Sequence, residues 1–172
     1  IDYNGLLLWE DEFNLTGKTI MRGNKIVTDG TVTYVTGCIG KEYYNNSIDA
    51  ITLAYNSDGS LLWSKVINLN SDYDEAFDIK AFGSGIVVSG LSKTNDSTFL
   101  FVANYGINGN ENWLYADYNP KWTDSYSFNN FPPLSTSIIT AGNDLYITGT
   151  TKPTQAVNYY TTVKLNFLGE YR

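Results

Sequence analysis

Apolar and polar residues alternate along most of this chain, with the period of two that extended strands require. The alternation is clearest in 49–59, 97–109 and 159–169, where β-branched or aromatic residues occupy every second position. In the middle of the chain it predicts four successive strands, at about 74–82, 85–92, 97–106 and 110–118. No stretch sustains a helical period of about 3.6 residues between capping residues, so we expect almost no helix. The pattern therefore predicts an all-β protein.

A glycine followed four residues later by a tryptophan recurs along the chain. The copies are GLLLW (Gly5 to Trp9), GSLLW (Gly59 to Trp63) and GNENW (Gly109 to Trp113). The tryptophans are 54 and 50 residues apart. Gly169 begins the pattern a fourth time, as GEYR, and its tryptophan would fall at position 173. A repeat of this length indicates copies of one supersecondary unit packed in a row.

A turn residue precedes most of these glycines. The pairs are Asn4-Gly5, Asp58-Gly59, Asn108-Gly109 and, less typically, Leu168-Gly169. Asn-Gly and Asp-Gly favour a two-residue hairpin with a type I′ turn, because that turn needs positive φ at both central positions. The sequence therefore predicts a tight hairpin before each tryptophan.

A second glycine keeps a similar spacing. It ends a strand-like segment three times, as YVTG (Gly37), VVSG (Gly90) and YITG (Gly149), at separations of 53 and 59 residues. Each repeat thus contains four short strands, which is typical of a β-propeller blade. A β-sandwich is the main alternative, although it requires no regular glycine–tryptophan spacing. We divide the chain into a single propeller segment with blade-equivalents at roughly 14–68, 69–118 and 119–172, and with 1–13 as the strand that completes a blade.

The repeat resembles the bacterial and archaeal propeller repeats known as SBBP-type or seven-bladed propeller repeats. The resemblance lies in YNSDGSLLW (55–63), YDEAF (73–77) and IVVSG (86–90). The hairpin is also similar to the tryptophan-docking motif of quinoprotein propellers. This resemblance implies a propeller fold over essentially the whole chain. It implies no particular chemistry, because such motifs specify how blades pack.

Three blade-equivalents are fewer than the roughly four to eight blades of closed propellers. We therefore expect the chain to be part of a larger propeller or to be completed by another chain, and two copies would supply six blades. The first strand, at about 5–13, and the last blade, which lacks an outer strand, complement each other in principle. Because open strand edges recruit partners, the expected partners are further blades of a longer chain or a second copy of this one.

The composition excludes several classes of function. The 172 residues include 18 acidic and 11 basic residues, one cysteine and no histidine. Without histidine there is no Ser-His-Asp triad, Cys-His pair, HExxH zinc site or His-ligated haem, and one cysteine allows no internal disulfide framework. The net charge of −7 argues against nucleic acid as a partner. No apolar run approaches the roughly 18 residues of a transmembrane helix.

The polar residues point to a location outside the cell. Charged residues make up 17% of the chain, against about 25% in a typical soluble domain, and Asn, Thr and Ser supply much of the remaining polarity. Acceptor triplets for N-glycosylation occur at Asn14, Asn45 and Asn95. We expect a secreted or cell-surface glycoprotein of archaeal or bacterial type. Because the chain opens on Ile1, we also expect it to be a processed protein or a piece of a longer one.

The tryptophans are the candidate ligand-binding residues. Trp9, Trp63 and Trp113 could stack on sugars, but their fixed phase with the hairpins favours packing between blades. Trp122 lies outside the repeat, in a predicted loop. The predicted binding site for a glycan or a protein comprises Trp122, Asp124 and Tyr126.

The run NLNSDYDEAFD (68–78) is the candidate cation site. Oxygen ligands at alternate positions suit calcium, which takes about six to eight oxygens. The candidate ligands are Asn68, Asn70, Asp72 and Asp74. The run lacks the glycine and the final glutamate of a calcium loop, so the alternative is a solvated loop in which Asp72 and Asp74 cap turns. Calcium is the only cofactor that the sequence suggests.

These features predict a non-catalytic, extracellular or cell-surface β-propeller module for binding or assembly. One alternative is a segment of an extracellular propeller enzyme, such as a glycoside-acting hydrolase, whose catalytic residues lie outside this chain. The acidic residues that could serve such chemistry in pairs are Glu10, Asp11 and Glu12 together with Asp72, Asp74 and Asp124. The other alternative is a structural subunit of a surface filament or lattice.

Overall fold

The computed structural model describes residues 4–41, 48–94, 98–122, 136–154 and 157–171. These residues form β-strands and no helix, which confirms the prediction of an all-β protein, and no membrane-spanning helix is found among them. The strands are β1 (Ile20–Thr28), β2 (Thr33–Gly40), β3 (Ile48–Tyr55), β4 (Leu61–Ile67), β5 (Tyr73–Phe82), β6 (Gly85–Lys93), β7 (Thr98–Gly106), β8 (Glu111–Trp122), β9 (Ser137–Ala141), β10 (Asp144–Thr154) and β11 (Val157–Asn166).

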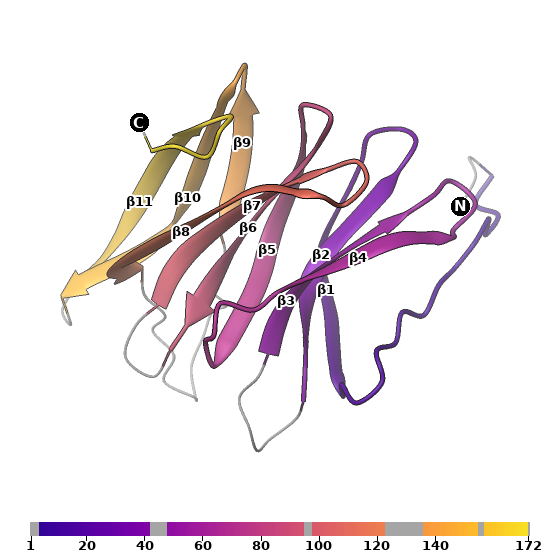
Figure 1. The fold of residues 1–172 in the computed structure, drawn as a ribbon, viewed down its shortest axis with the longest axis horizontal. Coiled ribbons are helices and arrows are strands. Elements are labelled where there is room, and N and C mark those ends of the chain that lie inside the picture. The colour runs from indigo at the N-terminus through magenta and orange to yellow at the C-terminus, as the bar shows by residue number, and fades with distance from the viewer. Residues whose placement is uncertain (1–3, 42–47, 95–97, 123–135, 155–156, 172) are drawn as a thin grey trace.

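The strands form three antiparallel units (Figure 1). Unit 1 comprises β1–β4, unit 2 comprises β5–β8 and unit 3 comprises β9–β11, and within a unit each strand pairs with the next. Single backbone pairings join neighbouring units, between Ile48 and Tyr73 and between Thr151 and Trp122. The strands of unit 2 begin and end close to the positions expected from the alternation, except that β8 continues to Trp122.

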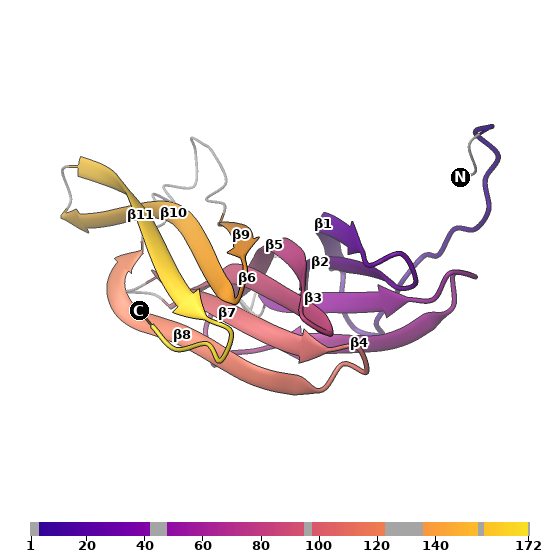
Figure 2. The same ribbon diagram turned by 90° about the horizontal axis from the view of Figure 1, so that it is seen from above.

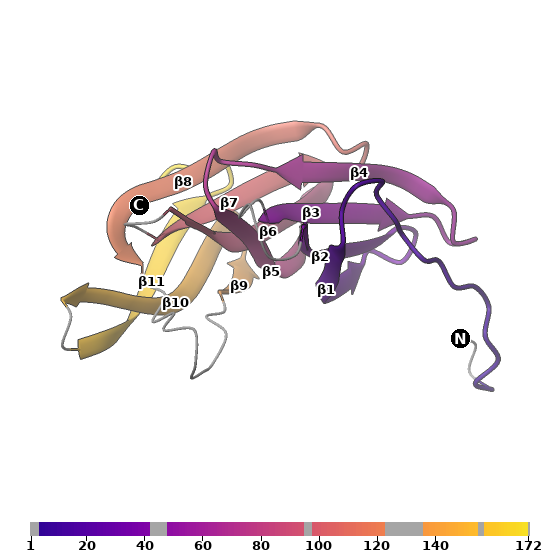
Figure 3. The ribbon, with the colours of Figure 1, turned by 90° about the horizontal axis from the view of Figure 1, so that it is seen from below.

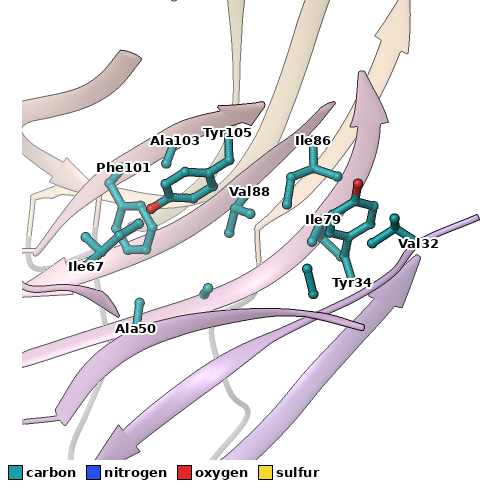
Figure 4. Close-up of a cluster of buried hydrophobic side chains, with 12 residues drawn as sticks. Val32, Tyr34, Ala50, Ile67, Ile79, Ile86, Val88, Phe101, Ala103 and Tyr105 are labelled. Carbon is teal, nitrogen blue, oxygen red and sulfur yellow. The ribbon is translucent and has the colours of Figure 1, made fainter. Parts of the chain in front are cut away.

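The units lie side by side with their faces packed together (Figure 2). The first strands of the units, β1, β5 and β9, contact one another in turn and lie on the opposite side of the molecule from β4 and β8. Val32, Tyr34 and Ala50 of unit 1 belong to one buried cluster with Ile79, Phe101 and Tyr105 of unit 2 (Figure 4). A second cluster lies between units 2 and 3. Its members are Val87, Leu91, Leu100, Val102, Ile138, Leu145, Ile147, Val163 and Leu165.

Unit 2 therefore has neighbours on both faces. This accounts for the continuous burial of β6 and β7, in which the side chains on both faces of the strand are buried. A strand covered on one face only would alternate buried and exposed positions. The burial pattern of its two central strands thus reflects the position of unit 2 between two other units.

The hairpins at Gly59, Gly109 and Gly169 are not the predicted type I′ turns. In the loop after β3, Gly59 N donates to Asn56 O at 3.0 Å and Asn56 N donates to Ser60 O at 2.9 Å. The same two bonds close the loops at 106–110 and 166–170. Each of these glycines has positive φ, but the residue before it does not, since Asn70 is the only described non-glycine residue with positive φ. The loops are therefore type I turns followed by a left-handed glycine bulge, the next most common hairpin geometry.

The second repeated glycine lies opposite a β-bulge. Gly37 pairs with Gly23 and Gly90 pairs with Ala76, and in both cases the facing strand carries an extra residue at the next position. A Cβ atom on Gly37 would lie 1.8 Å from the carbonyl oxygen of Arg22. Only glycine allows the two backbones to approach this closely.

Residues 5–13 form no strand, contrary to the sequence-based expectation. No described strand pairs with this segment, which lies along the side of unit 1 that faces away from unit 2 (Figure 3). Trp9 and Phe13 pack there on a buried cluster, whereas Leu6, Leu7 and Leu8 are exposed. The cluster comprises Ile39, Ile51, Leu53 and Tyr55. The segment thus covers an apolar face without forming a sheet.

Candidate functional site

The units are joined by tryptophans that dock on the hairpin of the next unit. Trp63 of unit 1 donates its indole N–H to Ile107 O in the hairpin of unit 2 at 2.9 Å. Trp113 of unit 2 donates in the same way to Phe167 O, at 2.9 Å, in the loop that follows unit 3. The ring of each tryptophan lies against the hairpin glycine, because a Cβ atom there would be 2.8 Å from Trp63 or 2.6 Å from Trp113. The glycine is therefore required both for its φ and for its lack of a side chain.

Trp9 makes the same kind of contact from outside the three units. A Cβ atom on Gly59 would lie 2.8 Å from the ring of Trp9. The ring also stacks on Tyr55, with centroids 5.8 Å apart and planes at 29°. Trp9 thus sits on unit 1 as Trp63 sits on unit 2 and Trp113 on the last hairpin.

A tyrosine on each side encloses the docked Trp63. Tyr34 of unit 1 lies 5.9 Å from the indole, and Tyr105 of unit 2 lies 6.0 Å from it. Aromatic pairs at these separations contribute about 0.5–1.5 kcal/mol beyond the area they bury. The three rings form one continuous contact across the boundary between the units.

A charged cluster joins the first strands of units 1 and 2. The Arg22 guanidinium donates to Glu75 Oε1 from Nη2 at 2.6 Å and from Nε at 3.1 Å. Asn24 donates to the same oxygen at 2.7 Å, and the Tyr73 hydroxyl donates to the other oxygen. The Glu75 side chain is only 5% exposed, so a buried carboxylate without these donors would be costly. All these groups hold the two strands together.

The thiol of Cys38 adjoins this cluster. The side chain is buried and lies 3.5 Å from Arg22 Nη2. Burial, together with the charge of Glu75, raises the pKa of Cys38 to about 11, although Arg22 acts in the opposite direction. The thiol is therefore protonated at neutral pH and is a poor nucleophile.

A buried aspartate makes the corresponding link from unit 2 to unit 3. Asp78 Oδ2 accepts a hydrogen bond from the backbone N–H of Ile138 at 2.8 Å, and the Ser137 hydroxyl lies 3.4 Å away. Lys80 approaches the other carboxylate oxygen at 3.6 Å. The first strands of all three units are thus connected by acidic side chains of β5.

The candidate calcium ligands take part in a turn. Asn68 donates to Asp49 at 2.8 Å, and its own oxygen accepts from Asn70 N at 2.8 Å. Asp74 Oδ2 accepts from Leu69 N at 3.1 Å. Asp72 is held through its backbone, which donates to Lys93 O at 2.9 Å. Among the described residues no group of three or more His, Cys, Asp or Glu side chains could hold a metal ion, so calcium remains a prediction from the sequence.

Asp74 is the most deeply buried acid of this turn. It is fully inaccessible to water, and its Oδ1 atom has no hydrogen-bond partner of good geometry. The hydroxyls of Ser71 and Ser92 are buried beside it. Burial raises the pKa of Asp74 more than the neighbouring hydroxyls and the Leu69 N–H lower it. The folded protein therefore holds this proton more tightly than the unfolded chain does.

This raised pKa fixes the sign of a pH dependence. Above the ordinary pKa of aspartate, about 4, the unfolded chain releases the proton first, so Asp74 makes the wild type lose stability as the pH rises through its folded pKa. Asp74→Asn removes this loss. We expect the free energy of unfolding of Asp74→Asn, relative to that of the wild type, to increase from pH 4 to pH 7, as measured by urea unfolding.

Asp58→Asn is the matched control, and its effect should have the opposite sign. Hydrogen bonds from the hydroxyl and backbone N–H of Ser60 lower the pKa of the exposed Asp58. That carboxylate stabilises the fold above its unfolded pKa and loses the effect as the pH falls. The free energy of unfolding of Asp58→Asn, relative to that of the wild type, should therefore decrease as the pH rises. Equal pH slopes for the two variants would contradict the assignment of Asp74.

Unit 3 has an uncovered face on the side away from unit 2. Its residues alternate with those of the buried cluster, so Ile139, Tyr146, Thr148 and Thr162 point the other way. Ile139 is 62% exposed, and Thr148 and Thr162 are exposed as well. Tyr160, at 92% exposure, extends this face along β11. The outer face of unit 1 is thus covered only by residues 5–13. The outer face of unit 3 is covered by no other described segment.

The other residues predicted from the sequence fall mainly at the surface or outside the described residues. Trp122 ends β8, where its backbone pairs with Thr98 and Thr151. Asn14 is exposed, as are Glu10, Asp11 and Glu12. Gly5 has positive φ, and Gly149 lies in β10 opposite Thr161. Four predicted site residues lie outside the described part of the chain, namely Asn45, Asn95, Asp124 and Tyr126.

Sequence reasoning missed the Arg22–Glu75 cluster and Asp78. Arg22 pairs with Cys38 and Glu75 pairs with Leu91, and these two partners directly follow the repeated glycines Gly37 and Gly90. Arg22 and Glu75 therefore occupy the same repeat position in successive units. A comparison for opposite charges at equivalent positions would have found the pair.

The contacts between units join neighbouring units in a row. No protein-family model matches this chain, and no curated protein matches it.

Proposed function

We propose that this chain is a non-catalytic β-propeller module, secreted or displayed on a cell surface, that functions in binding and assembly. Its three antiparallel units are blade-like, since each is a meander and the first strands gather on one side of the molecule. The observation that carries the proposal is the repeated Trp–Gly docking contact, made by Trp9, Trp63 and Trp113. A device that joins unit to unit can add further units at both ends.

The polar chemistry supports a structural role. Glu75, Asp78 and Arg22 are engaged across unit boundaries, and Asp49 accepts from Lys18 at 2.7 Å and from Asn68 at 2.8 Å. A general acid or base must instead face a reacting group. The extracellular location is supported by the acceptor triplets and by the low content of charged residues.

Sedimentation equilibrium of the 172-residue chain tests the proposal. We expect species heavier than the 19.2 kDa monomer, at integer multiples of its mass, because each end of the row of units offers a docking face. Thr148→Lys places a charge on the open face of unit 3 and should reduce assembly at least tenfold, since burying an unpaired charge is costly.

Asn143→Lys is the control for that variant. It adds the same charge to the same unit, on the exposed β9–β10 turn, and should assemble as the wild type does. Both positions are exposed, so neither substitution should unfold the chain. A 19.2 kDa monomer at every concentration would contradict the proposed assembly.

A further inference from the structure

The open face of unit 3 repeats the face with which unit 1 receives unit 2. In unit 1, Thr36 and Thr52 are directly opposite each other, their hydroxyls are 3.0 Å apart, and Thr36 also donates to Ile51 O. In unit 3, Thr148 and Thr162 are paired in the same way, with a 3.3 Å contact and a bond from Thr148 to Thr161 O. The threonine pair of unit 1 is buried beneath unit 2, but the pair of unit 3 is exposed.

The apolar positions around the threonines correspond as well. Two residues before the first threonine, unit 1 has Tyr34 and unit 3 has Tyr146. On the first strand, Val27 packs on the boundary with unit 2, and its counterpart in unit 3 is Ile139. Ile139 is 62% exposed. The face of unit 3 thus has several side chains of a boundary between units but no unit against it among the described residues. Lys164 takes the place of Ala54 there, pairs with Asp144 at 2.7 Å and lies over the ring of Tyr146.

Unit 1 presents the complementary face on its other side. Tyr55 precedes its hairpin as Tyr105 precedes the hairpin of unit 2, and Leu53 and Ile51 correspond to Ala103 and Phe101. In unit 2 this face packs on Tyr34, with Trp63 held between two tyrosines. On unit 1 the stack contains only Trp9 and Tyr55 among the described rings, so the place of Tyr34 is open.

One edge of β11 is paired, and the other is largely unpaired among the described residues. β11 pairs with β10 on one edge, and on its other edge the described residues make a single bridge, between Leu165 and Tyr171. This bridge corresponds to the pairing of Tyr55 with Leu61, from which β4 continues through Trp63. In unit 1, Trp63 lies opposite Ala54, the residue before Tyr55. By the same register, the position on β11 that corresponds to Ala54 is Lys164.

We propose that this chain binds a second copy of itself head to tail. Unit 3 of one copy packs on unit 1 of the next, and residues 9–13 of the second copy continue the fourth strand on β11 of the first. This inference rests on the proposed assembly function. Trp9 then lies between Tyr55 of its own copy and Tyr146 of the other copy, as Trp63 lies between Tyr105 and Tyr34.

The register of this interface follows from the pairing in unit 1. Trp63 lies opposite Ala54, Lys65 opposite Thr52 and Ile67 opposite Ala50. Transferred to unit 3, Trp9 lies opposite Lys164, Asp11 opposite Thr162, and Phe13 opposite Tyr160. Phe13 thereby covers a tyrosine that is 92% exposed, and the acidic segment 10–12 lies near the lysine. Because the two surfaces differ, the contact is heterologous and leads to a closed ring or an open filament.

Disulfide trapping tests the register directly. One preparation carries Asp11→Cys and another carries Thr162→Cys, and the two are mixed under mild oxidation. Paired positions on neighbouring strands have Cα atoms about 4.5–5.5 Å apart, within the range of a disulfide. We expect a covalent dimer on non-reducing gels from the mixture, and at least tenfold less from either preparation alone. Both positions are exposed, so the substitutions should leave the chain folded.

Asn143→Cys mixed with Asp11→Cys is the matched control. Asn143 is also exposed and belongs to the same unit, but it lies on a turn off the proposed interface. Cys38 is buried, so the wild type serves as the control for the native thiol. An assembled preparation without the Asp11–Thr162 cross-link, or with equal cross-linking at Asn143, would overturn this inference and leave the proposed function standing. A monomer in solution would overturn both.

Discussion

Replacing Gly37 by alanine should destabilise the protein by about 3 kcal/mol or more, because inserting an atom into packed backbone is at the costly end of overpacking. The new Cβ atom would lie 1.8 Å from Arg22 O and 2.8 Å from Arg22 C, and backbone atoms cannot rotate away as a side chain can. For a chain of this length the loss corresponds to a fall in melting temperature of about 6–12 °C. Differential scanning calorimetry measures it.

Gly23→Ala provides the control, and its effect should differ in sign. Gly23 is the direct register partner of Gly37 in β1. A Cβ atom there would lie 3.5 Å from Val35 Cγ1, an ordinary contact. Glycine inside a strand costs about 0.5–1 kcal/mol relative to alanine, so this variant should be slightly more stable than the wild type. Similar losses from both substitutions would show that general strand flexibility, and not the close approach, explains the glycine.

The repeated glycines illustrate what a sequence can and cannot reveal. Gly37 and Gly90 were found by their spacing, since the repeat copies the same packing problem. Their cause, a bulge in the facing strand, was not visible, because the extra residues Asn24 and Phe77 have nothing in common. The turn type was wrong for a related reason. Asp-Gly suits both a type I′ turn and a type I turn with a glycine bulge, and the pairing of the flanking strands decides between them.

The contacts between units were harder to foresee. A search for repeats looks for identity, whereas Arg22 and Glu75 interact because they differ at equivalent positions. Identical residues there would place like charges side by side. Residues 5–13 had a strand pattern but form no strand, since a strand needs a backbone partner and no described strand supplies one. The pattern of side chains determines which face Trp9 covers. A backbone partner for residues 9–13 is supplied only by the proposed head-to-tail contact.

Gly109→Ala should cost about 3 kcal/mol through the docking contact and the backbone together. The residue has φ of +74°, and a non-glycine residue in the left-handed region costs about 1–2 kcal/mol. The Cβ atom would also lie 2.8 Å from the ring of Trp63. The ring must move, which weakens its bond to Ile107 O and its contacts with Tyr34 and Tyr105. A hydrogen bond and an aromatic pair are each worth about 1 kcal/mol.

Gly142→Ala separates the two causes. Gly142 has φ of +60° in the β9–β10 turn, and nothing lies within 4 Å of a Cβ atom built there. This variant should therefore lose only the backbone share, about 1 kcal/mol. The difference between the two variants measures the docking contact alone.

A double-mutant cycle with Trp63→Leu identifies the ring as the source of that difference. In the Trp63→Leu background Gly109→Ala meets no indole, so its cost should fall to that of Gly142→Ala, giving an interaction energy of about 2 kcal/mol. Gly142→Ala should cost the same in both backgrounds, because it is remote from Trp63 in the fold. An additive cycle at Gly109 would mean that the hairpin glycine is needed for its φ alone. In that event the Trp–Gly contact could not be the device that joins one unit to the next, and the assembly argued from Trp9 would lose its physical basis.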